Sequence, residues 1–321
     1  MNQYRAPWWL PGGHAQTIIP ARVLPAPQVG YRRERWDAPD GDFIDVDFVV
    51  PEPTTPSAPL MVLFHGLEGD SRSHYARILM QGCRRRSWLG MVVHFRGCSG
   101  ETNRLPRAYH SGDSEEIDWI LRRVALRWPQ AQRFAVGISL GGNVLAKWAG
   151  ERGEQALGIL SACATVSAPF DLVEGGRSLD RGVNVIYTRS FLRTMRKKAI
   201  AKAQRFPGVF DARKVAQCRT MYDFDDAFTA PLHGFGGALD YWRRASAKPL
   251  LAAISIPTLA LNAGNDPIVP ADSLPDRGQV SRHVRQDLPS EGGHVGFFAQ
   301  DCASDRWYLR ERIFHFFQTG T

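Results

Sequence analysis

The sequence has 321 residues, which is long enough to bury one large core or two small ones. Hydrophobic residues make up 44% and charged residues 22%, as in ordinary globular proteins, and no uninterrupted apolar run is long enough to span a membrane. The net charge of +8 would suit nucleic acid, but no nucleic-acid-binding motif is present, so we expect an arginine-rich surface and no nucleic-acid partner.

The cysteines and the known cofactor motifs indicate whether a metal or cofactor is expected, and the amino terminus indicates the cellular compartment. The five cysteines are odd in number and form no CxxC pair, which argues against a disulfide framework and against a zinc site. No P-loop, no GxGxxG after a strand and no HExxH is present. We therefore expect neither a metal nor a cofactor. Residues 1–9 lack the apolar segment of a signal peptide, so we expect the protein in the cytoplasm.

The first predicted element is a β-hairpin, in which residues 33–38 precede a turn at Asp40-Gly41 and residues 43–50 alternate apolar and acidic side chains. Beyond the hairpin, strands alternate with helices. Short apolar runs predict buried strands, and helical periodicity predicts helices. The predicted strands are 59–64, 90–95, 133–137, 157–166, 258–262 and 284–288, and the predicted helices are 74–88, 113–128, 142–150 and 306–317. This alternation predicts an α/β fold with a mostly parallel sheet covered by helices on both faces.

The alternation stops after Pro169, and the residues up to about 250 are mostly helical, basic and aromatic. The interruption predicts a helical cap at 170–250, inserted between two parts of one core, 1–169 and 251–321. Within it, residues 189–205 form an amphipathic helix with Phe191 and Met195 on its apolar side and basic side chains expected to face outward. This helix is either an ordinary solvated helix, or it roofs an acyl pocket while its basic side chains contact lipid headgroups at a membrane surface.

The strongest chemical signal is the motif Gly137-Ile138-Ser139-Leu140-Gly141. A predicted strand runs into it and a predicted helix leaves it, which is the context of a nucleophile elbow. Glycines at 137 and 141 suit a strained turn whose close backbone contacts exclude side chains. The amino terminus of the helix also favours negative charge near Ser139. We therefore interpret Ser139 as a nucleophile, and a glycine-rich turn without chemistry is the alternative.

A serine nucleophile needs a base, and the base needs an acid to orient it, in the chain order Ser, Asp or Glu, His. His294 lies in a glycine-rich loop after the last predicted strand, and Asp266 follows the predicted strand 258–262. The competing residues are the histidines His233, His283 and His315 and the acids Asp276 and Asp287. Asp266 could also serve only as a turn residue before Pro267. We select Ser139, His294 and Asp266 because all three lie at the carboxyl edge of the predicted sheet.

Acyl transfer also needs N–H donors for an oxyanion. One candidate is the backbone N–H of Leu140, the residue after the nucleophile. The second is the N–H of Leu67, in the loop His65-Gly66-Leu67-Glu68-Gly69, whose glycines permit close approach of the backbone to a substrate. We interpret the imidazole of His65 as a structural hydrogen-bonding group.

These residues resemble the α/β-hydrolase superfamily and, more narrowly, the YheT-like group, also called the AB-hydrolase 4 family. The motifs extend over nearly the whole chain in order. They are residues 7–17 (PWWLPGGHAQT), 65–69 (HGLEG), 95–100 (FRGCSG), 109–113 (YHSGD), 137–143 (GISLGGN), 224–226 (FDD), 229–231 (TAP), 233–235 (HGF), 266–267 (DP) and 292–296 (GGHVG). The resemblance implies an α/β-hydrolase fold and the same triad of Ser139, Asp266 and His294.

The resemblance also implies an activity. Members of the group act as carboxylesterases and lipases on short-chain esters, monoacylglycerols or related lipids, and some relatives are acyltransferases. His65 and Asp70 match a His-x4-Asp motif credited to some of those relatives, but we assign it no role, and we treat His14 in segment 7–17 as structural. We expect ester hydrolysis through an acyl-enzyme on a small-molecule or lipid ester. Acyl transfer by the same triad and a non-catalytic scaffold are the alternatives, and the oligomeric state stays open.

Overall fold

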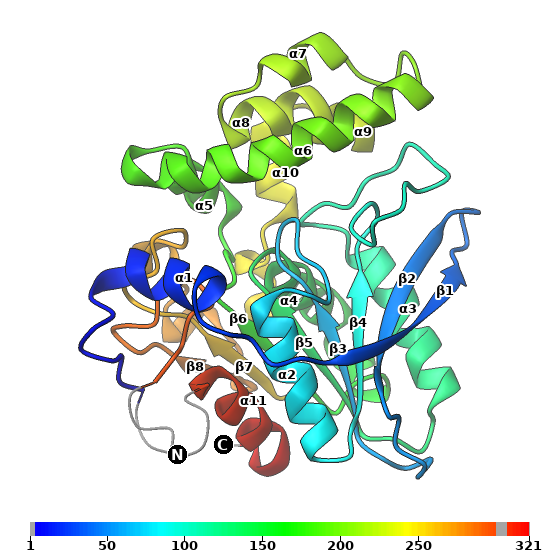
Figure 1. Ribbon diagram of the computed structural model, residues 1–321, viewed down its shortest axis with the longest axis vertical. Coiled ribbons are helices and arrows are strands. Elements are labelled where there is room, and N and C mark those ends of the chain that lie inside the picture. The colour runs from blue at the N-terminus through cyan, green and yellow to red at the C-terminus, as the bar shows by residue number, and fades with distance from the viewer. Residues whose placement is uncertain (1–3, 300–306, 321) are drawn as a thin grey trace.

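The computed structural model describes residues 4–299 and 307–320, and an eight-stranded sheet forms its centre (Figure 1). The strands lie in the order β1-β2-β4-β3-β5-β6-β7-β8. The antiparallel pairs are β1 with β2 and β2 with β4, and the other pairs are parallel. Their bounds are β1 (Gly30–Asp37), β2 (Phe43–Val50), β3 (Leu60–Phe64), β4 (Leu89–His94), β5 (Arg133–Ile138), β6 (Ala162–Val166), β7 (Thr258–Leu261) and β8 (Val284–Asp287). The predicted α/β fold and the predicted hairpin are confirmed.

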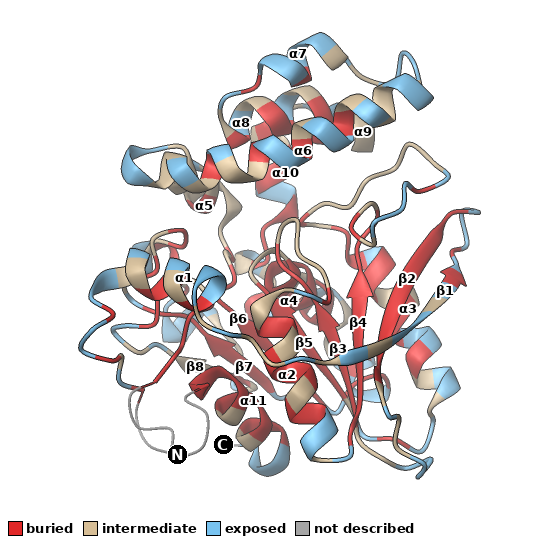
Figure 2. Cartoon of the chain, in the orientation of Figure 1, coloured by how far each residue is buried: buried red, intermediate tan, exposed pale blue. Residues whose placement is uncertain are grey.

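Helices cover both faces of the sheet. Two of them, α3 (Ser114–Arg127) and α4 (Leu140–Arg152), pack with Leu60, Val62 and Phe64 of β3 on one face. On the other face, α2 (His74–Arg85) and α11 (Tyr308–Thr319) pack with the intervening residues of β3. Figure 2 shows the central strands buried along their length. Burial on both sides explains why these strands are continuously apolar rather than alternating.

A group of helices stands above the carboxyl edge of the sheet, at the top of Figure 1. It comprises α5 (Leu172–Leu179), α6 (Val185–Arg205), α7 (Ala212–Gln217), α8 (Met221–Phe224), α9 (Ala230–His233) and α10 (Ala238–Ala245). These helices, called the cap below, share an apolar cluster of their own around Leu192, Phe228 and Trp242. The division of the chain into domains at 169 and 250 stays a prediction. Across the described residues, none of the helices combines the length and the apolar character needed to cross a bilayer.

Three sequence-based expectations differ from the structure. The strand predicted at 157–166 begins too early, because Gly153–Gly158 form a 3-10 helix in which Leu157 is exposed. The predicted terminal helix includes Arg306, which lies outside the described residues, and α11 begins at Tyr308. No helix was predicted in the amino-terminal segment, yet Gly12–Arg22 form α1, which has no apolar stripe and contains Pro20.

The basic side chains of α6 also depart from the expectation that they face outward. Lys198 Nζ bonds to Glu68 Oε1 (3.0 Å), and Lys202 Nζ donates to the carbonyl oxygens of Leu105 and Arg107 (3.1 and 3.0 Å). Both lysines therefore reach from the cap toward the core. The core offers them a carboxylate and free carbonyl oxygens, and these partners were not evident from the pattern of α6 alone.

Candidate active site

Ser139 lies on a sharp turn between β5 and α4, with φ of 51° and ψ of −116°. This is an uncommon conformation for a residue with a side chain. A Cβ at Gly137 would lie 2.4 Å from the carbonyl oxygen of Gly141, and a Cβ at Gly141 would lie 2.4 Å from that of Phe64. The two glycines of the motif are therefore required by close backbone contact. The turn lifts the Ser139 hydroxyl above the carboxyl edge of the sheet.

Ser139, His294 and Asp266 form one continuous chain of hydrogen bonds. His294 Nε2 is 2.9 Å from Ser139 Oγ, and His294 Nδ1 is 2.8 Å from Asp266 Oδ2. A carboxylate can only accept, so Nδ1 carries the proton and donates it to Asp266. Nε2 is then left to accept from the serine hydroxyl. This is the tautomer in which histidine can remove a proton from serine.

The structure fixes Asp266 firmly in this arrangement. Its side chain is fully buried, and its second oxygen, Oδ1, accepts from the backbone N–H groups of Ile268 (2.8 Å) and Val269 (3.1 Å). The turn role considered for Asp266 and its contact with His294 therefore coexist, one on each carboxylate oxygen. Such double acceptance holds the carboxylate plane in one orientation toward the imidazole.

The competing residues lie elsewhere. Asp276 caps a 3-10 turn, and Asp287 on β8 pairs with Arg312. His233 packs against His110 with ring centroids 4.4 Å apart, and His283 lies beside Arg282. His315 belongs to α11, which packs on the face of the sheet opposite α3 and α4. None of these five residues has a hydrogen bond to Ser139 within the described part of the chain.

The loop predicted to supply an oxyanion donor has most of its amides already engaged. The N–H groups of Gly66 and Glu68 donate to Tyr75 Oη (3.0 Å) and Tyr109 Oη (2.9 Å), and Gly69 donates to the Gly66 carbonyl. Among the hydrogen bonds of the described residues, the Leu67 N–H has no acceptor. Leu140 is the first residue of α4, where an N–H has no partner within the helix. Leu67 and Leu140 line the same cavity as Ser139 and His294, so both predicted donors lie at the site.

His65 and Asp70 do not join the site. His65 is fully buried, Nδ1 donates to the Gly66 carbonyl (2.7 Å) and Nε2 accepts from the Phe95 N–H (3.1 Å). Burial lowers the pKa of His65 to about 3, so its imidazole is neutral. Asp70 pairs with Arg72. Both nitrogens of His65 are thus used in holding the loop, as expected for a structural histidine.

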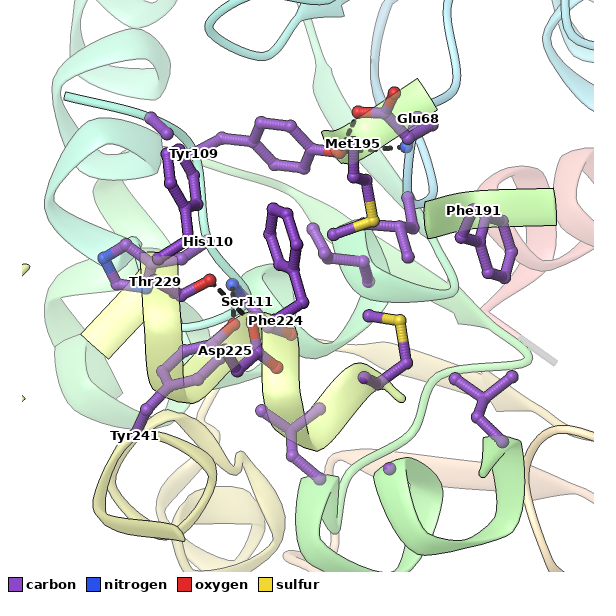
Figure 3. A pocket seen from close by; sticks show the side chains of 18 of the residues that line it. Glu68, Tyr109, His110, Ser111, Phe191, Met195, Phe224, Asp225, Thr229 and Tyr241 are labelled. Atoms are coloured by element: carbon purple, nitrogen blue, oxygen red, sulfur yellow. Dashed lines mark hydrogen bonds between the residues drawn. The ribbon is translucent and has the colours of Figure 1, made fainter. Parts of the chain in front are cut away.

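A cavity of about 160 Å³ opens between Ser139 and the cap. Its walls are mostly apolar, with Phe191 and Met195 of α6 and Phe224 of α8 pointing into it (Figure 3). Asp225 also lines it, Thr229 Oγ1 and Trp242 Nε1 donate to this carboxylate, and burial raises its pKa to about 6. A mostly apolar cavity of this kind suits an apolar chain of a ligand whose polar end lies at Ser139.

Sequence analysis missed two residues next to this cavity. Tyr109 accepts from the Glu68 N–H and donates to Glu68 Oε1 (3.0 Å), as the dashed lines in Figure 3 show, and Lys198 pairs with the same carboxylate. Tyr109 belongs to the motif YHSGD, but the motif alone gives no role for its hydroxyl. Lys198 belongs to the basic side chains expected to face outward, but it follows Met195 by three residues and therefore lies on the face of α6 that lines the cavity.

Comparison with known proteins places the chain in a family. The α/β hydrolase fold family matches residues 59–301. YheT of Escherichia coli (strain K12) is 36% identical over 302 residues, which cover 94% of this chain and 88% of that protein. Phospholipase ABHD3 of Homo sapiens is 27% identical over 313 residues, 95% of this chain and 76% of that protein. Monoacylglycerol lipase of Saccharomyces cerevisiae is 26% identical over 298 residues, 88% of this chain and 64% of that protein.

The fold itself is shared with more distant solved structures. Esterase Pf2001 of Pyrococcus furiosus has a TM-score of 0.56 at 14% sequence identity, covering 90% of this chain and 92% of that one. Mouse alpha/beta hydrolase domain-containing protein 10 has the same TM-score at 17% identity, covering 90% of this chain and 100% of that one. The chain belongs to the α/β hydrolase fold family and, within it, to the YheT-like group.

Proposed function

We propose that this protein hydrolyses carboxylic esters, short-chain or monoacylglycerol-like, through an acyl-enzyme on Ser139. The observation that carries the proposal is the unbroken hydrogen-bond chain from Ser139 through His294 to Asp266, at the mouth of an apolar cavity. Relatives that are named as a monoacylglycerol lipase and as phospholipases support ester cleavage as the class of reaction.

The first half of the reaction forms the acyl-enzyme. His294 Nε2 takes the proton of the Ser139 hydroxyl while Oγ bonds to the ester carbonyl carbon. The carbonyl oxygen becomes an oxyanion and accepts hydrogen bonds from the N–H groups of Leu67 and Leu140. When the carbonyl re-forms, the bond to the alcohol oxygen breaks, and the alcohol leaves with the proton of His294. Asp266 stabilises the imidazolium between these two steps.

The second half releases the acid. His294 removes a proton from water, the hydroxide oxygen bonds to the acyl carbon, and the bond to Ser139 Oγ breaks as the serine regains its proton. Acyl transfer follows the same course with an alcohol in place of water. Product analysis in the presence of added glycerol therefore distinguishes the two reactions. Hydrolysis gives free acid at the rate of ester loss, whereas acyl transfer gives an ester of glycerol.

The test is labelling and turnover of the wild-type protein and Ser139→Ala. Wild type should react with a fluorophosphonate probe and cleave p-nitrophenyl esters of graded chain length. Ser139→Ala should fold, fail to label, and lose up to about 10⁶-fold in kcat. A folded Ser139→Ala protein with near-wild-type turnover would exclude Ser139 as the nucleophile, and a wild-type protein that neither labels nor cleaves would favour the non-catalytic scaffold.

A further inference from the structure

The loop that carries His294 has no regular structure and an unusual backbone. Gly292 and Gly293 have φ of 145° and 60°, and Val295 and Phe297 have φ of 61° and 36°. Positive φ is uncommon for a residue with a side chain and strained for a β-branched one. Such a conformation persists only where surrounding groups impose it, so the position of His294 depends on what the loop contacts.

Four consecutive amides of this loop donate to side chains outside it. Two of the acceptors belong to α1: Gly292 N–H donates to Gln16 Oε1 (2.8 Å), and the N–H of His294 itself donates to Thr17 Oγ1 (2.8 Å). The others are Asn265 Oδ1, which accepts from Gly293 N–H (3.0 Å), and Ser167 Oγ, which accepts from Val295 N–H (3.0 Å). Side chains from outside the loop therefore hold each of these four amides in place.

Gln16 also ties the histidine loop to the loop of the acid. Its Oε1 accepts from Asn265 Nδ2 (2.9 Å), next to Asp266 in the chain, as well as from the Gly292 N–H. Its Nε2 donates to the Leu10 carbonyl (2.8 Å), which holds the amide in this orientation. One buried side chain therefore bridges the two loops whose separation sets the contact of His294 with Asp266.

The backbone of α1 also lies in direct contact with both loops. A Cβ at Gly13 would lie 1.9 Å from the Asn265 carbonyl oxygen, and a Cβ at Gly296 would lie 1.9 Å from that of Gln16. Figure 1 shows α1 beside the loops that follow β7 and β8. Gly13 in α1 and Gly296 in the histidine loop permit this close approach because neither carries a Cβ. Backbone contact of this kind places α1 against the loops even though the helix has no apolar stripe.

We propose that Gln16 and Thr17 are positioning residues for the Ser139–His294–Asp266 site: α1 holds the histidine loop against the acid loop, and Thr17 fixes the backbone of His294. This inference rests on the proposed hydrolase function. It gives a role to segment 7–17, whose residues Gln16 and Thr17 contact the loops that carry His294 and Asp266. Residues 12–22 do not line the acyl cavity, so their effect should fall on the chemical steps rather than on substrate binding.

The experiment compares Thr17→Val, Thr17→Ala, Thr17→Ser and Thr188→Val with wild type. The Thr17 hydroxyl also donates to the Gly13 carbonyl (2.6 Å). Thr188 is the matched control, because it is likewise a buried helical threonine whose hydroxyl donates to a backbone carbonyl, that of Leu179, but in the cap and outside the acyl cavity. The measurements are kcat per active site titrated with fluorophosphonate, KM for a p-nitrophenyl ester, the midpoint of thermal unfolding, and the low-field proton NMR resonance of His294 Nδ1–H. Thr17→Ala has a smaller side chain, so a folded variant without the hydroxyl is obtained even where valine is not accommodated.

Thr17→Val and Thr17→Ala should lower kcat by about 10- to 100-fold, because small misplacement of a catalytic group has effects of this size. KM should change little, and the Nδ1–H resonance should move or broaden. Thr17→Ser retains the hydroxyl and should restore kcat and the resonance, and Thr188→Val should lower the unfolding midpoint without changing kcat per site. A Thr17 variant that loses only thermal stability would overturn the inference. Turnover that survives in Ser139→Ala would instead overturn the proposed function itself.

Discussion

Lys198 Nζ lies 2.9 Å from Glu68 Oε2, so helix α6 of the cap is ion-paired to the loop that contains Leu67. The lysine side chain is 43% exposed and the glutamate side chain 10%. A partly exposed ion pair contributes at most about 1 kcal/mol to stability. Its importance is therefore geometric: together with Tyr109, which bonds both the backbone and the carboxylate of Glu68, it holds the loop beside Ser139.

Tyr109→Phe should lower kcat by about tenfold or more while leaving the fold intact. The change removes the acceptor of the Glu68 N–H, which frees the loop that orients Leu67. Deletion of an oxyanion donor costs about 10² to 10³ in kcat, and a loosened donor should cost less. The measurement is kcat on a short p-nitrophenyl ester. Tyr31→Phe is the control, because it likewise removes a phenol hydroxyl that is hydrogen-bonded, here as the donor to the Ser71 carbonyl, without touching Glu68. Equal rates in the two variants would contradict a role for Tyr109.

Asp266→Asn should lower kcat by about 10⁴, because an amide in place of the carboxylate lets His294 adopt the wrong tautomer. Oδ1 can still accept from Ile268 and Val269, so the unfolding midpoint should change far less than the rate. Asp276→Asn is the matched control, since that aspartate caps a surface turn. A larger kinetic defect in Asp276→Asn than in Asp266→Asn would show that the acid has been misassigned.

The parts of the fold that the sequence predicts are those set by local sterics and by burial. The strands around β3 are continuously apolar because both faces of the sheet are covered, and this pattern needs no knowledge of the partners. Gly137 and Gly141 flank Ser139 because a Cβ at either would collide with a backbone oxygen. Order along the chain then places Asp266 and His294 at the same edge, so the three residues could be brought together without coordinates.

What the sequence did not predict depends on contacts between distant segments. Gly12–Arg22 lack an apolar stripe and include Pro20, so nothing local favours a helix, and α1 is stabilised by the loops around Asn265 and Gly293. Lys198 and Lys202 follow Met195 by three and seven residues, so they share the face of α6 that lines the cavity, but their acceptors, Glu68 and the backbone carbonyl oxygens, belong to a distant part of the chain. Periodicity identifies a polar face but does not identify its partners.

Phe191→Ala and Met195→Ala should each flatten the dependence of activity on acyl length. Both side chains line the cavity above Ser139, and each buried methylene contributes about 0.8 kcal/mol, roughly fourfold in kcat/KM. In wild type, kcat/KM should therefore rise with chain length until the cavity is filled and then fall. The measurement is kcat/KM over a series of p-nitrophenyl esters.

The control for these two variants is Leu192→Ala, which removes a side chain that is buried in the apolar cluster of the cap but does not line the cavity. It should cost about 2 to 5 kcal/mol of stability and leave the shape of the chain-length profile unchanged. If all three variants reduce activity on acetyl and longer esters by the same factor, α6 supports the cap without shaping the acyl site.

His233→Gln should reduce the loss of stability in acid. Burial, followed by the charge of nearby His110, lowers the pKa of His233 to about 3, and its Nε2 is buried without a hydrogen-bond partner among the described residues. In the unfolded chain the imidazole titrates near 6.5. Between pH 6.5 and 3 the unfolded state therefore binds a proton that the folded state does not, so the free energy of unfolding falls as the pH falls. The contribution of this histidine is fully present above pH 6.5 and decreases by about 1.4 kcal/mol per pH unit below it.

Glutamine has no titration in this range, so urea unfolding of wild type and His233→Gln should diverge by about 2 kcal/mol between pH 8 and pH 5, in favour of the variant. The comparison at pH 8 removes any difference in packing, because both side chains are neutral there. Parallel pH dependences for the two proteins would mean that His233 is protonated in the folded state, and that its contact with His110 opens in acid.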